Sequence, residues 1–374
     1  MLVNVFILLL GLSSAVGFHS PLIKHSKFKS QGRYKALKND LRYKIQIGIG
    51  TPVQTFNVVI DLTSWDSWIA DKNCVGVSDC EQCYGSCHEF GCTECCALES
   101  EEKCPANILY DPSTSSTYKS NQTKWENFGN NFGYWCSDVV TLTGTETTAN
   151  EVKFAQVETL DWETFGYTDF GDVSGSFGIA ISNQNSSIFE QGVQAGAFED
   201  SKIGIWLNGT FESKEGDIIG GISFGSYDKE RCPGVLSTVP LANAQWTIQL
   251  NGVSVGKYSF DYTFSAEVQL DADKLFVPYD VYDKILVATN AHYDDTLGID
   301  VADCNQTTQL KFKTDAGDIT LDFADYTERR GDVCVYKILE GNVDDIGLGF
   351  PFLSKYCAIV DVKTSEFSYT PLVL

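Results

Sequence analysis

Two short segments, 210 residues apart, constrain this chain more than any other part of its sequence. Residues 56–65 read FNVVIDLTSW, and residues 266–276 read AEVQLDADKLF. In each segment the alternating apolar residues of a β-strand end on an aspartate, Asp61 or Asp271, that opens a turn. A strand and turn that recur in this way predict two related lobes, each presenting one carboxylate to the other.

The rest of the chain favours β-structure. It consists mainly of short strand-like runs separated by Gly, Asn, Asp and Ser turns, and residues 187–194 and 277–291 suit short helices. The expected fold class is therefore mainly β, with two lobes and a deep cleft between them. We expect the N-terminal lobe to comprise residues 45–228 and the C-terminal lobe residues 229–374.

An ordered series of motifs resembles the pepsin-like aspartic peptidases, whose lobes each carry two hydrophobic residues, Asp-Thr-Gly, and then Ser or Thr. The matching segments are residues 47–54 (IGIGTPVQ), 67–69 (SWI), 110–118 (YDPSTSSTY), 251–256 (NGVSVG), 281–285 (VYDKI), 348–353 (LGFPFL) and 356–361 (YCAIVD). The resemblance covers nearly the whole chain. It implies a bilobal pepsin-like fold and peptide-bond hydrolysis at acid pH.

The resemblance also assigns a chemical role to the two aspartates. In this family two carboxylates share one proton, because like charges so close together cannot both ionise. One carboxylate takes a proton from water while the other protonates the scissile carbonyl. These roles fall to Asp61 and Asp271, and the reaction requires no cofactor and no metal ion.

The residues that follow the two aspartates depart from the family pattern. Leu62 and Ala272 replace the Thr residues whose hydroxyls brace the two loops, and a misplacement of about 1 Å can lower the rate roughly a hundredfold. Thr63 and Asp273 replace the two Gly residues. Thr63 adds β-branched bulk, and Asp273 adds a third carboxylate near a like-charged pair.

Other cleft residues are partly retained. Ser64, whose counterpart in the family hydrogen-bonds the first aspartate, is present, as is Trp68, which is expected to line the cleft. In the flap that covers the cleft, Phe128 stands where the family has a Tyr, and the flap is a few residues shorter. We therefore expect the cleft to keep part of its peptide-binding shape although residues that support catalysis are lost.

The N-terminal region has two parts. Residues 1–17 are uncharged and mostly apolar, which predicts a signal peptide cleaved before Phe18 and too short to serve also as a membrane span. Residues 18–44 carry eight Lys or Arg and one Asp, whereas residues 45–374 have 19 basic and 49 acidic residues, a net charge of −30. By resemblance this basic stretch is a short pro-segment that masks an acidic cleft, and a flexible basic arm is the alternative.

Composition sets further expectations for compartment and partners. We expect a soluble monomer in a secreted, lysosomal or gut-lumen type of compartment, binding a peptide or protein in its cleft. So acidic a body should avoid nucleic acid, and we expect no membrane partner. Four predicted glycosylation acceptors are Asn121, Asn185, Asn208 and Asn305.

The 13 cysteines favour an oxidising compartment. Eight of them fall within an insert at residues 74–104, where the C-x-x-C pairs at residues 80–83 and 92–95, with His88 between them, allow a zinc site as the alternative to disulfides. By resemblance the second lobe is bridged by Cys304–Cys334, and Cys232–Cys357 is a further expected pair. An odd total leaves one thiol unpaired or joined to another chain.

Three functions are compatible with these observations. The first is a secreted pepsin-like homologue with impaired or absent peptidase activity that binds a peptide or protein. The second is an active acid endopeptidase working through Asp61 and Asp271. The third is a binding module formed by the cysteine-rich insert on an inert scaffold.

Overall fold

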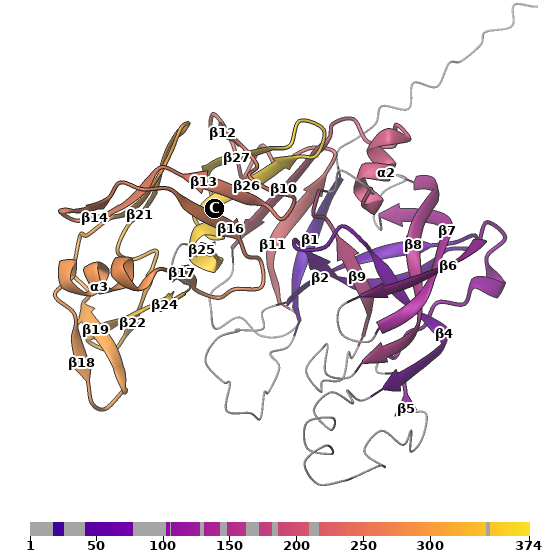
Figure 1. Ribbon diagram of the computed structural model, residues 1–374, viewed down its shortest axis with the longest axis horizontal. Helices are drawn as coiled ribbons and strands as arrows, with labels where there is room; N and C mark the ends of the chain where they lie inside the picture. Colours follow the sequence, from indigo (N-terminus) through magenta and orange to yellow (C-terminus); the bar gives the residue numbers. More distant parts are fainter. Residues whose placement is uncertain are drawn as a thin grey trace, which may run out of the picture.

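The computed structural model describes residues 18–25, 42–77, 102–104, 106–127, 131–142, 148–161, 172–181, 186–208, 217–341 and 345–374. Over these residues the molecule is mainly β, and Figure 1 shows two lobes on either side of a central group of strands. The predicted fold class is confirmed. None of the helices in these ranges is long and apolar enough to cross a membrane.

The largest sheet has 14 strands and runs through the N-terminal lobe and the centre of the molecule, in the order β12-β27-β26-β10-β11-β1-β2-β3-β9-β4-β8-β7-β6, with β5 paired to β4. Its strands are β1 (Phe18–His25), β2 (Arg42–Ile49), β3 (Gln54–Asp61), β4 (Trp68–Val77), β5 (Glu102–Lys103), β6 (Lys119–Asn127), β7 (Asn131–Leu142), β8 (Thr148–Asp161), β9 (Val173–Gly178), β10 (Lys202–Leu207), β11 (Ile218–Phe224), β12 (Ser237–Pro240), β26 (Tyr356–Asp361) and β27 (Glu366–Pro371). The chain's last strands thus join the same sheet as its first.

The C-terminal lobe contains three smaller sheets. The five-stranded sheet has the order β13 (Thr247–Leu250), β16 (Phe264–Val268), β25 (Asp345–Leu348), β17 (Leu275–Val277) and β24 (Ile338–Glu340). The two four-stranded sheets are β15 (Tyr258–Phe260), β14 (Gly252–Val255), β20 (Leu310–Thr314), β21 (Gly317–Leu321), and β18 (His292–Asp294), β19 (Ile299–Asp303), β23 (Val333–Tyr336), β22 (Thr327–Arg330). Asp271 lies in the turn that follows β16, at the end of that strand of the five-stranded sheet.

Helices are short and few in the described residues. They are the 3-10 helix η1 (Pro112–Thr114) and the α-helices α2 (Ile188–Gln194), α3 (Tyr279–Ala288) and α4 (Phe350–Leu353). The helices predicted at residues 187–194 and 277–291 correspond to α2 and α3. Helix α2 begins at a capping box, in which the Ser187 side chain and the Glu190 side chain each accept a backbone N–H of the other residue.

The two aspartate strands show the alternation from which they were predicted. In β3 the side chains of Phe56, Val58 and Ile60 are buried, and the residues between them are not. Strand β16 alternates in the same way. One continuous apolar core runs beneath both lobes and anchors one face of each strand. On the other face, Val59 of β3 packs against a second apolar cluster, whereas Ser265 and Glu267 of β16 line a cavity.

Disulfides stabilise both lobes. Cys304–Cys334 and Cys232–Cys357 are bonded as predicted, and Cys74–Cys104 closes the base of the cysteine-rich insert. Cys136 is a free, buried thiol, so an unpaired cysteine is confirmed. The remaining cysteines of the insert and His88 lie outside the described residues, and the choice between disulfides and zinc stays open there.

The segment predicted to start the secreted chain forms strand β1. This strand pairs antiparallel with β11 on one side and with β2 on the other, as Figure 1 shows near the centre of the molecule. A flexible arm therefore does not describe residues 18–25. Residues 26–41 lie outside the described part, and cleavage after the basic segment stays a prediction.

Three of the four predicted glycosylation acceptors fall on described residues. Asn121, Asn208 and Asn305 are exposed. Asn185 lies outside the described residues. Exposure makes attachment of a glycan sterically feasible at the first three, and glycosylation itself stays a prediction.

Candidate active site

Asp61 is the last residue of β3, and the neighbouring strand β9 fixes its backbone. Strands β3 and β9 run parallel, with Asp61 opposite Gly178. The Asp61 carbonyl accepts the N–H of Ile179 at 2.9 Å. A Cβ atom on Gly178 would lie 2.6 Å from the Ser64 carbonyl oxygen, so only glycine lets the loop approach β9 this closely.

The Asp61 carboxylate accepts three hydrogen bonds at Oδ1. The donors are the Thr63 backbone N–H at 2.8 Å, the Thr63 hydroxyl at 2.7 Å and the Ser64 backbone N–H at 3.2 Å. The residue in the family's Gly position thus supplies a hydroxyl that orients the first aspartate. Sequence analysis missed this role of Thr63. The only available signal is that an Asp side chain often accepts the backbone N–H two residues further along the chain.

The prediction that the Ser64 hydroxyl bonds Asp61 is wrong. That hydroxyl donates to the carboxylate of Asp66, which also accepts the indole N–H of Trp125 at 2.6 Å. The Asp66 carboxylate is only two residues further along the chain, and the Ser64 hydroxyl can donate to it directly. Only the backbone N–H of Ser64 contacts Asp61.

In the C-terminal lobe, the loop that carries Asp271 is held by a neighbouring segment. Strand β16 runs parallel to β25, as β3 runs parallel to β9. The Ala272 carbonyl accepts the N–H of Phe350 at 2.8 Å, and a Cβ on Gly349 would lie 2.7 Å from that carbonyl oxygen. The two aspartates therefore occupy comparable positions: Asp61 is the last residue of β3, Asp271 lies in the turn after β16, and a glycine allows close approach to each loop.

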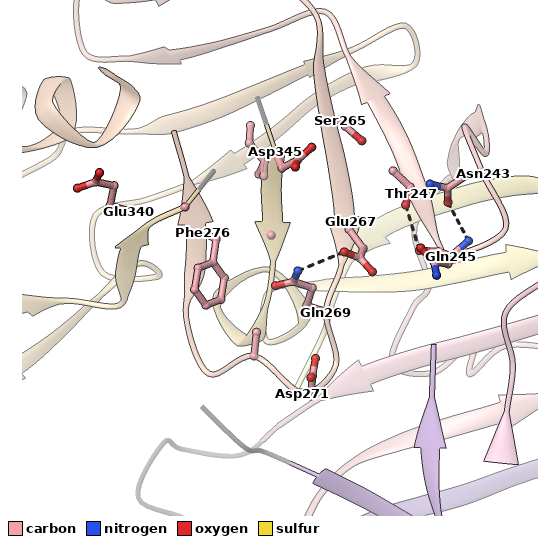
Figure 2. A pocket seen from close by; sticks show the side chains of 14 residues that line it. Asn243, Gln245, Thr247, Ser265, Glu267, Gln269, Asp271, Phe276, Glu340 and Asp345 are labelled. Carbon is pink, nitrogen blue, oxygen red and sulfur yellow. Dashed lines mark hydrogen bonds between the residues drawn. The ribbon is translucent and has the colours of Figure 1, made fainter. Parts of the chain in front are cut away.

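A hydrogen bond between the lobes links the two loops. The Gln245 side chain of the C-terminal lobe donates from Nε2 to the carbonyl of Thr63 at 3.2 Å. Gln245 and Asp271 line the same cavity, of about 510 Å³. The loop that carries Asp61 thus borders the cavity that contains Asp271, which Figure 2 shows from close by.

The substituted residues lie buried beneath the two loops. Leu62 is 4% exposed and Ala272 is 6% exposed, and neither has a hydroxyl to donate. Asp273 is 2% exposed, so the third carboxylate is also buried. Burial, and after it the negative charges of Asp273 and Asp271, raises the pKa of the Tyr43 hydroxyl on β2. The buried carboxyl of Asp273 and the buried phenol of Tyr43 thus lie near the exposed carboxylate of Asp271.

Only the strands of the predicted flap lie within the described residues, and the position of Phe128 stays a prediction. Strands β6 and β7 form a hairpin in which Asn127 pairs with Asn131, and Phe128 lies between them outside the described residues. Trp68 does not line the described cavity. It is 4% exposed and packs in a small apolar cluster that includes Trp125, because it begins β4 on the buried face of the sheet.

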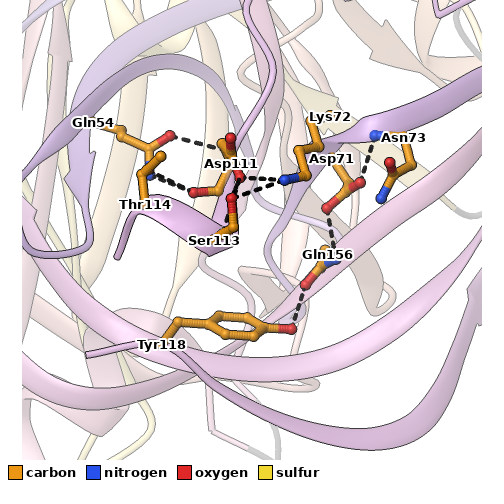
Figure 3. A network of polar contacts seen from close by, with 9 residues as sticks. All are labelled: Gln54, Asp71, Lys72, Asn73, Asp111, Ser113, Thr114, Tyr118 and Gln156. Atoms are coloured by element: carbon orange, nitrogen blue, oxygen red, sulfur yellow. Dashed lines mark hydrogen bonds and ion pairs between the residues drawn. The ribbon is translucent and has the colours of Figure 1, made fainter. Parts of the chain in front are cut away.

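A polar network supports the N-terminal lobe near the base of the flap strands (Figure 3). The Tyr118 hydroxyl donates to Oε1 of Gln156, and Nε2 of Gln156 donates to Oδ2 of Asp71 at 2.6 Å. Burial raises the pKa of Asp71, against the opposing effect of its hydrogen bonds from Asn73 and Gln156. Beside it, Lys72 pairs with Asp111 at 2.7 Å. Tyr118 and Asp111 of the 110–118 motif thus link the loop before β6 to strands β8 and β4.

Comparisons with known proteins agree with this geometry. A family model described as eukaryotic aspartyl protease matches residues 42–372. The chain is similar to Aspartic protease 10 of Caenorhabditis elegans (25% identity, 87% of this chain and 82% of that protein) and to Aspartic protease 2 of Necator americanus (25%, 88% and 83%). It is also similar to Vacuolar protease A of Arthroderma otae (24%, 86% and 76%).

Proposed function

The chain belongs to the eukaryotic aspartyl protease family, and from this premise we propose that it binds peptide segments beside Asp61 and Asp271 but hydrolyses them slowly or not at all. The observation that carries the proposal is the burial of Leu62 and Ala272 in the positions of the two bracing Thr residues. Without those hydroxyls, each carboxylate loses a fixed reference to the opposite loop. Catalysis depends on that alignment more steeply than binding does.

Asp273 supports the same proposal through electrostatics. The dyad works when one of two neighbouring carboxylates is ionised and the other protonated. A third carboxylate buried beside the pair perturbs that balance, and Asp273 has only 2% of its surface exposed. Slow or absent hydrolysis is the expected result, whereas a peptide backbone can still hydrogen-bond within the cleft.

A second candidate function is an active acid endopeptidase. The three hydrogen bonds to Oδ1 of Asp61 favour it, because they orient the first carboxylate without the help of the missing Thr. The hydroxyl of Thr63 provides side-chain support at this aspartate.

The deciding experiment measures binding and cleavage separately. The full secreted chain is mixed with a diverse peptide library between pH 3 and 7; bound peptides are identified after filtration, and cleaved peptides by mass spectrometry, beside an Asp61→Asn control. Binding without cleavage beyond the control supports the proposal. Cleavage at acid pH that disappears in the control establishes the endopeptidase, and the absence of both overturns both candidates.

A restoring variant makes the test sharper. The double substitution Leu62→Thr with Ala272→Thr returns both hydroxyls, and Leu62→Val with Ala272→Val is a branched control without them. We expect the Thr pair to increase the cleavage rate at least tenfold over the Val pair. Equal rates would show that the missing hydroxyls do not limit hydrolysis.

Secretion is the remaining part of the proposal. Three disulfides among the described residues support an oxidising compartment. N-terminal sequencing of the protein recovered from the medium of producing cells should find Phe18 first. A first residue beyond position 44 would instead show that the basic segment is removed as a pro-segment.

A further inference from the structure

The cavity beside Asp271 has room for a long side chain. Its volume is about 510 Å³, and its walls come from the five strands β13, β16, β17, β24 and β25 or the loops next to them (Figure 2). Strand β16 and the turn after it, which carries Asp271, form one wall. Every second residue from 265 to 271 lines the cavity, whereas the residues between them are buried in the core. Glu267 on the strand and Asp271 in the turn therefore line the same cavity.

The lining of the cavity is strongly acidic. Glu267, Asp271, Glu340 and Asp345 contribute four carboxylates, and no described lining residue is Lys, Arg or His. Glu267 is the partly buried member of the group, and its Oε2 accepts a long hydrogen bond of 3.3 Å from the side-chain amide of Gln269. Burial, followed by the charges of Asp271 and Asp345, raises the pKa of Glu267.

The arrangement suits an organic cation better than a metal ion. Within the described ranges, no group of three or more His, Cys, Asp and Glu side chains is close enough to bind a metal. The carboxylates are instead distributed around the cavity, where Phe276 and Ile346 provide apolar surface between them. A methylene chain that ends in a positive charge matches both features, because such side chains bury their stems and keep their charged ends paired.

We propose that this cavity binds a Lys or Arg side chain of a peptide ligand and that Glu267 determines the preference. The inference rests on the proposed function, since it names the class of peptide that the same cleft accepts. The side-chain oxygens of Gln245 and Gln269, which also line the cavity, provide further acceptors for an ammonium or guanidinium group. The preference applies whether the bound peptide is later cleaved or released intact.

The test uses a lysine scan. A fluorescein-labelled decapeptide of Ala, Leu and Gly residues is made with norleucine or Lys at each position in turn, and binding to the full chain is measured by fluorescence polarisation at pH 6.5 and about 150 mM salt. We expect Lys to improve affinity about tenfold or more over norleucine at one or two positions only. An improvement that is equal at every position would reflect long-range attraction by the acidic body and would overturn the inference.

Matched variants assign the effect to the cavity. Glu267→Gln should abolish the Lys preference with a loss of about tenfold to a hundredfold for the Lys peptide and little change for norleucine. Glu328→Gln changes a carboxylate on β22 that does not line the cavity and should leave the preference intact. Asp345→Asn, at an exposed position of the rim, should reduce the preference a few-fold and does not depend on the folding of the Glu267 variant.

The outcomes separate this inference from the proposed function. Peptides that bind with equal affinity for Lys and norleucine overturn the cation preference and leave peptide binding intact. A preference that persists in both Glu267→Gln and Asp345→Asn, each verified as folded by circular dichroism, overturns the assignment to this cavity. The absence of peptide binding to the folded wild-type chain overturns both.

Discussion

Thr63 stands in a position where its family relatives have glycine, yet it supplies two of the three hydrogen bonds to the Asp61 carboxylate. The substitution thus removes conformational freedom and adds a donor. The retained aspartate is supported from its own loop instead of from the opposite lobe. This local support explains how the first carboxylate keeps its orientation when Leu62 carries no hydroxyl.

Replacing Thr63 by Val is the direct test of that support. Thr63→Val keeps the β-branched shape and removes the 2.7 Å hydrogen bond to Asp61, and because the side chain is exposed we expect a loss of about 0.5–1.5 kcal/mol in the free energy of unfolding at pH 7. Thr63→Ser keeps the hydroxyl and should stay close to wild type. Urea unfolding measures both, and equal midpoints would contradict the assigned role of the hydroxyl.

Protonation of Glu267 should make the cation preference depend on pH. Asp271 and Asp345 are the charged groups that face Glu267, and its neighbours across the adjacent strands, Thr247 and Gly347, carry no charge. Because burial, and after it the charges of Asp271 and Asp345, raise the pKa of Glu267, its negative charge is lost at a higher pH than that of an ordinary Glu as pH falls.

The measurement is the ratio of Lys to norleucine peptide affinity between pH 4 and 7.5. We expect the ratio to fall towards unity on the acid side and to be nearly flat in Glu267→Gln. A ratio that is constant in the wild type, or that falls equally in the variant, would assign the pH dependence to another group.

Among the elements, the two aspartate strands were the most predictable from sequence, because alternating apolar residues such as Phe56, Val58 and Ile60 report burial directly. Helices α2 and α3 were also predictable. Pairing over long distances was not: the match of Lys202 with Asp361 across β10 and β26 has no local signal. Likewise, the Ser64 hydroxyl bonds Asp66 instead of Asp61 because of side-chain competition, which a family motif does not encode.

The disulfides should differ in their contribution to the stability of these elements. Cys232–Cys357 closes a separation of 125 residues and Cys304–Cys334 one of 30 residues. A longer closed loop removes more entropy from the unfolded chain. Replacing both cysteines by Ala should therefore lower the free energy of unfolding by roughly 1 kcal/mol more for the first pair than for the second. Denaturant unfolding of the two double variants measures this difference, and the reverse order would contradict the loop-entropy explanation.

For the whole molecule, the net charge and the buried acids predict that the fold is more stable at mildly acidic pH than at neutral pH. The net charge is −23, and burial raises the pKa values of Asp71 and Glu267 in the folded state. A carboxyl whose folded pKa is raised binds its proton more readily in the folded protein, so its destabilising charge is removed as pH falls from neutral. Asp322 and Asp361 behave oppositely. Their pKa values are lowered in the folded state by hydrogen bonds and ion pairs, so their stabilisation is lost at lower pH.

We therefore expect the melting temperature to be higher near pH 5 than at pH 7.5 and to decline below about pH 4. Differential scanning calorimetry across this range provides the measurement. Because part of the effect is self-repulsion, about 0.5 M salt should reduce the difference between pH 5 and pH 7.5. A maximum at neutral pH in low salt would contradict this account.

Strand β1 has a consequence for self-association. Because β11 and β2 both pair with it, loss of residues 18–25 would open two strand edges within the central sheet at once. Open edges are templates for pairing with another chain. A chain trimmed before Arg42 would therefore aggregate, unless a later segment or the N-terminal strand of a second molecule filled the gap by domain swapping.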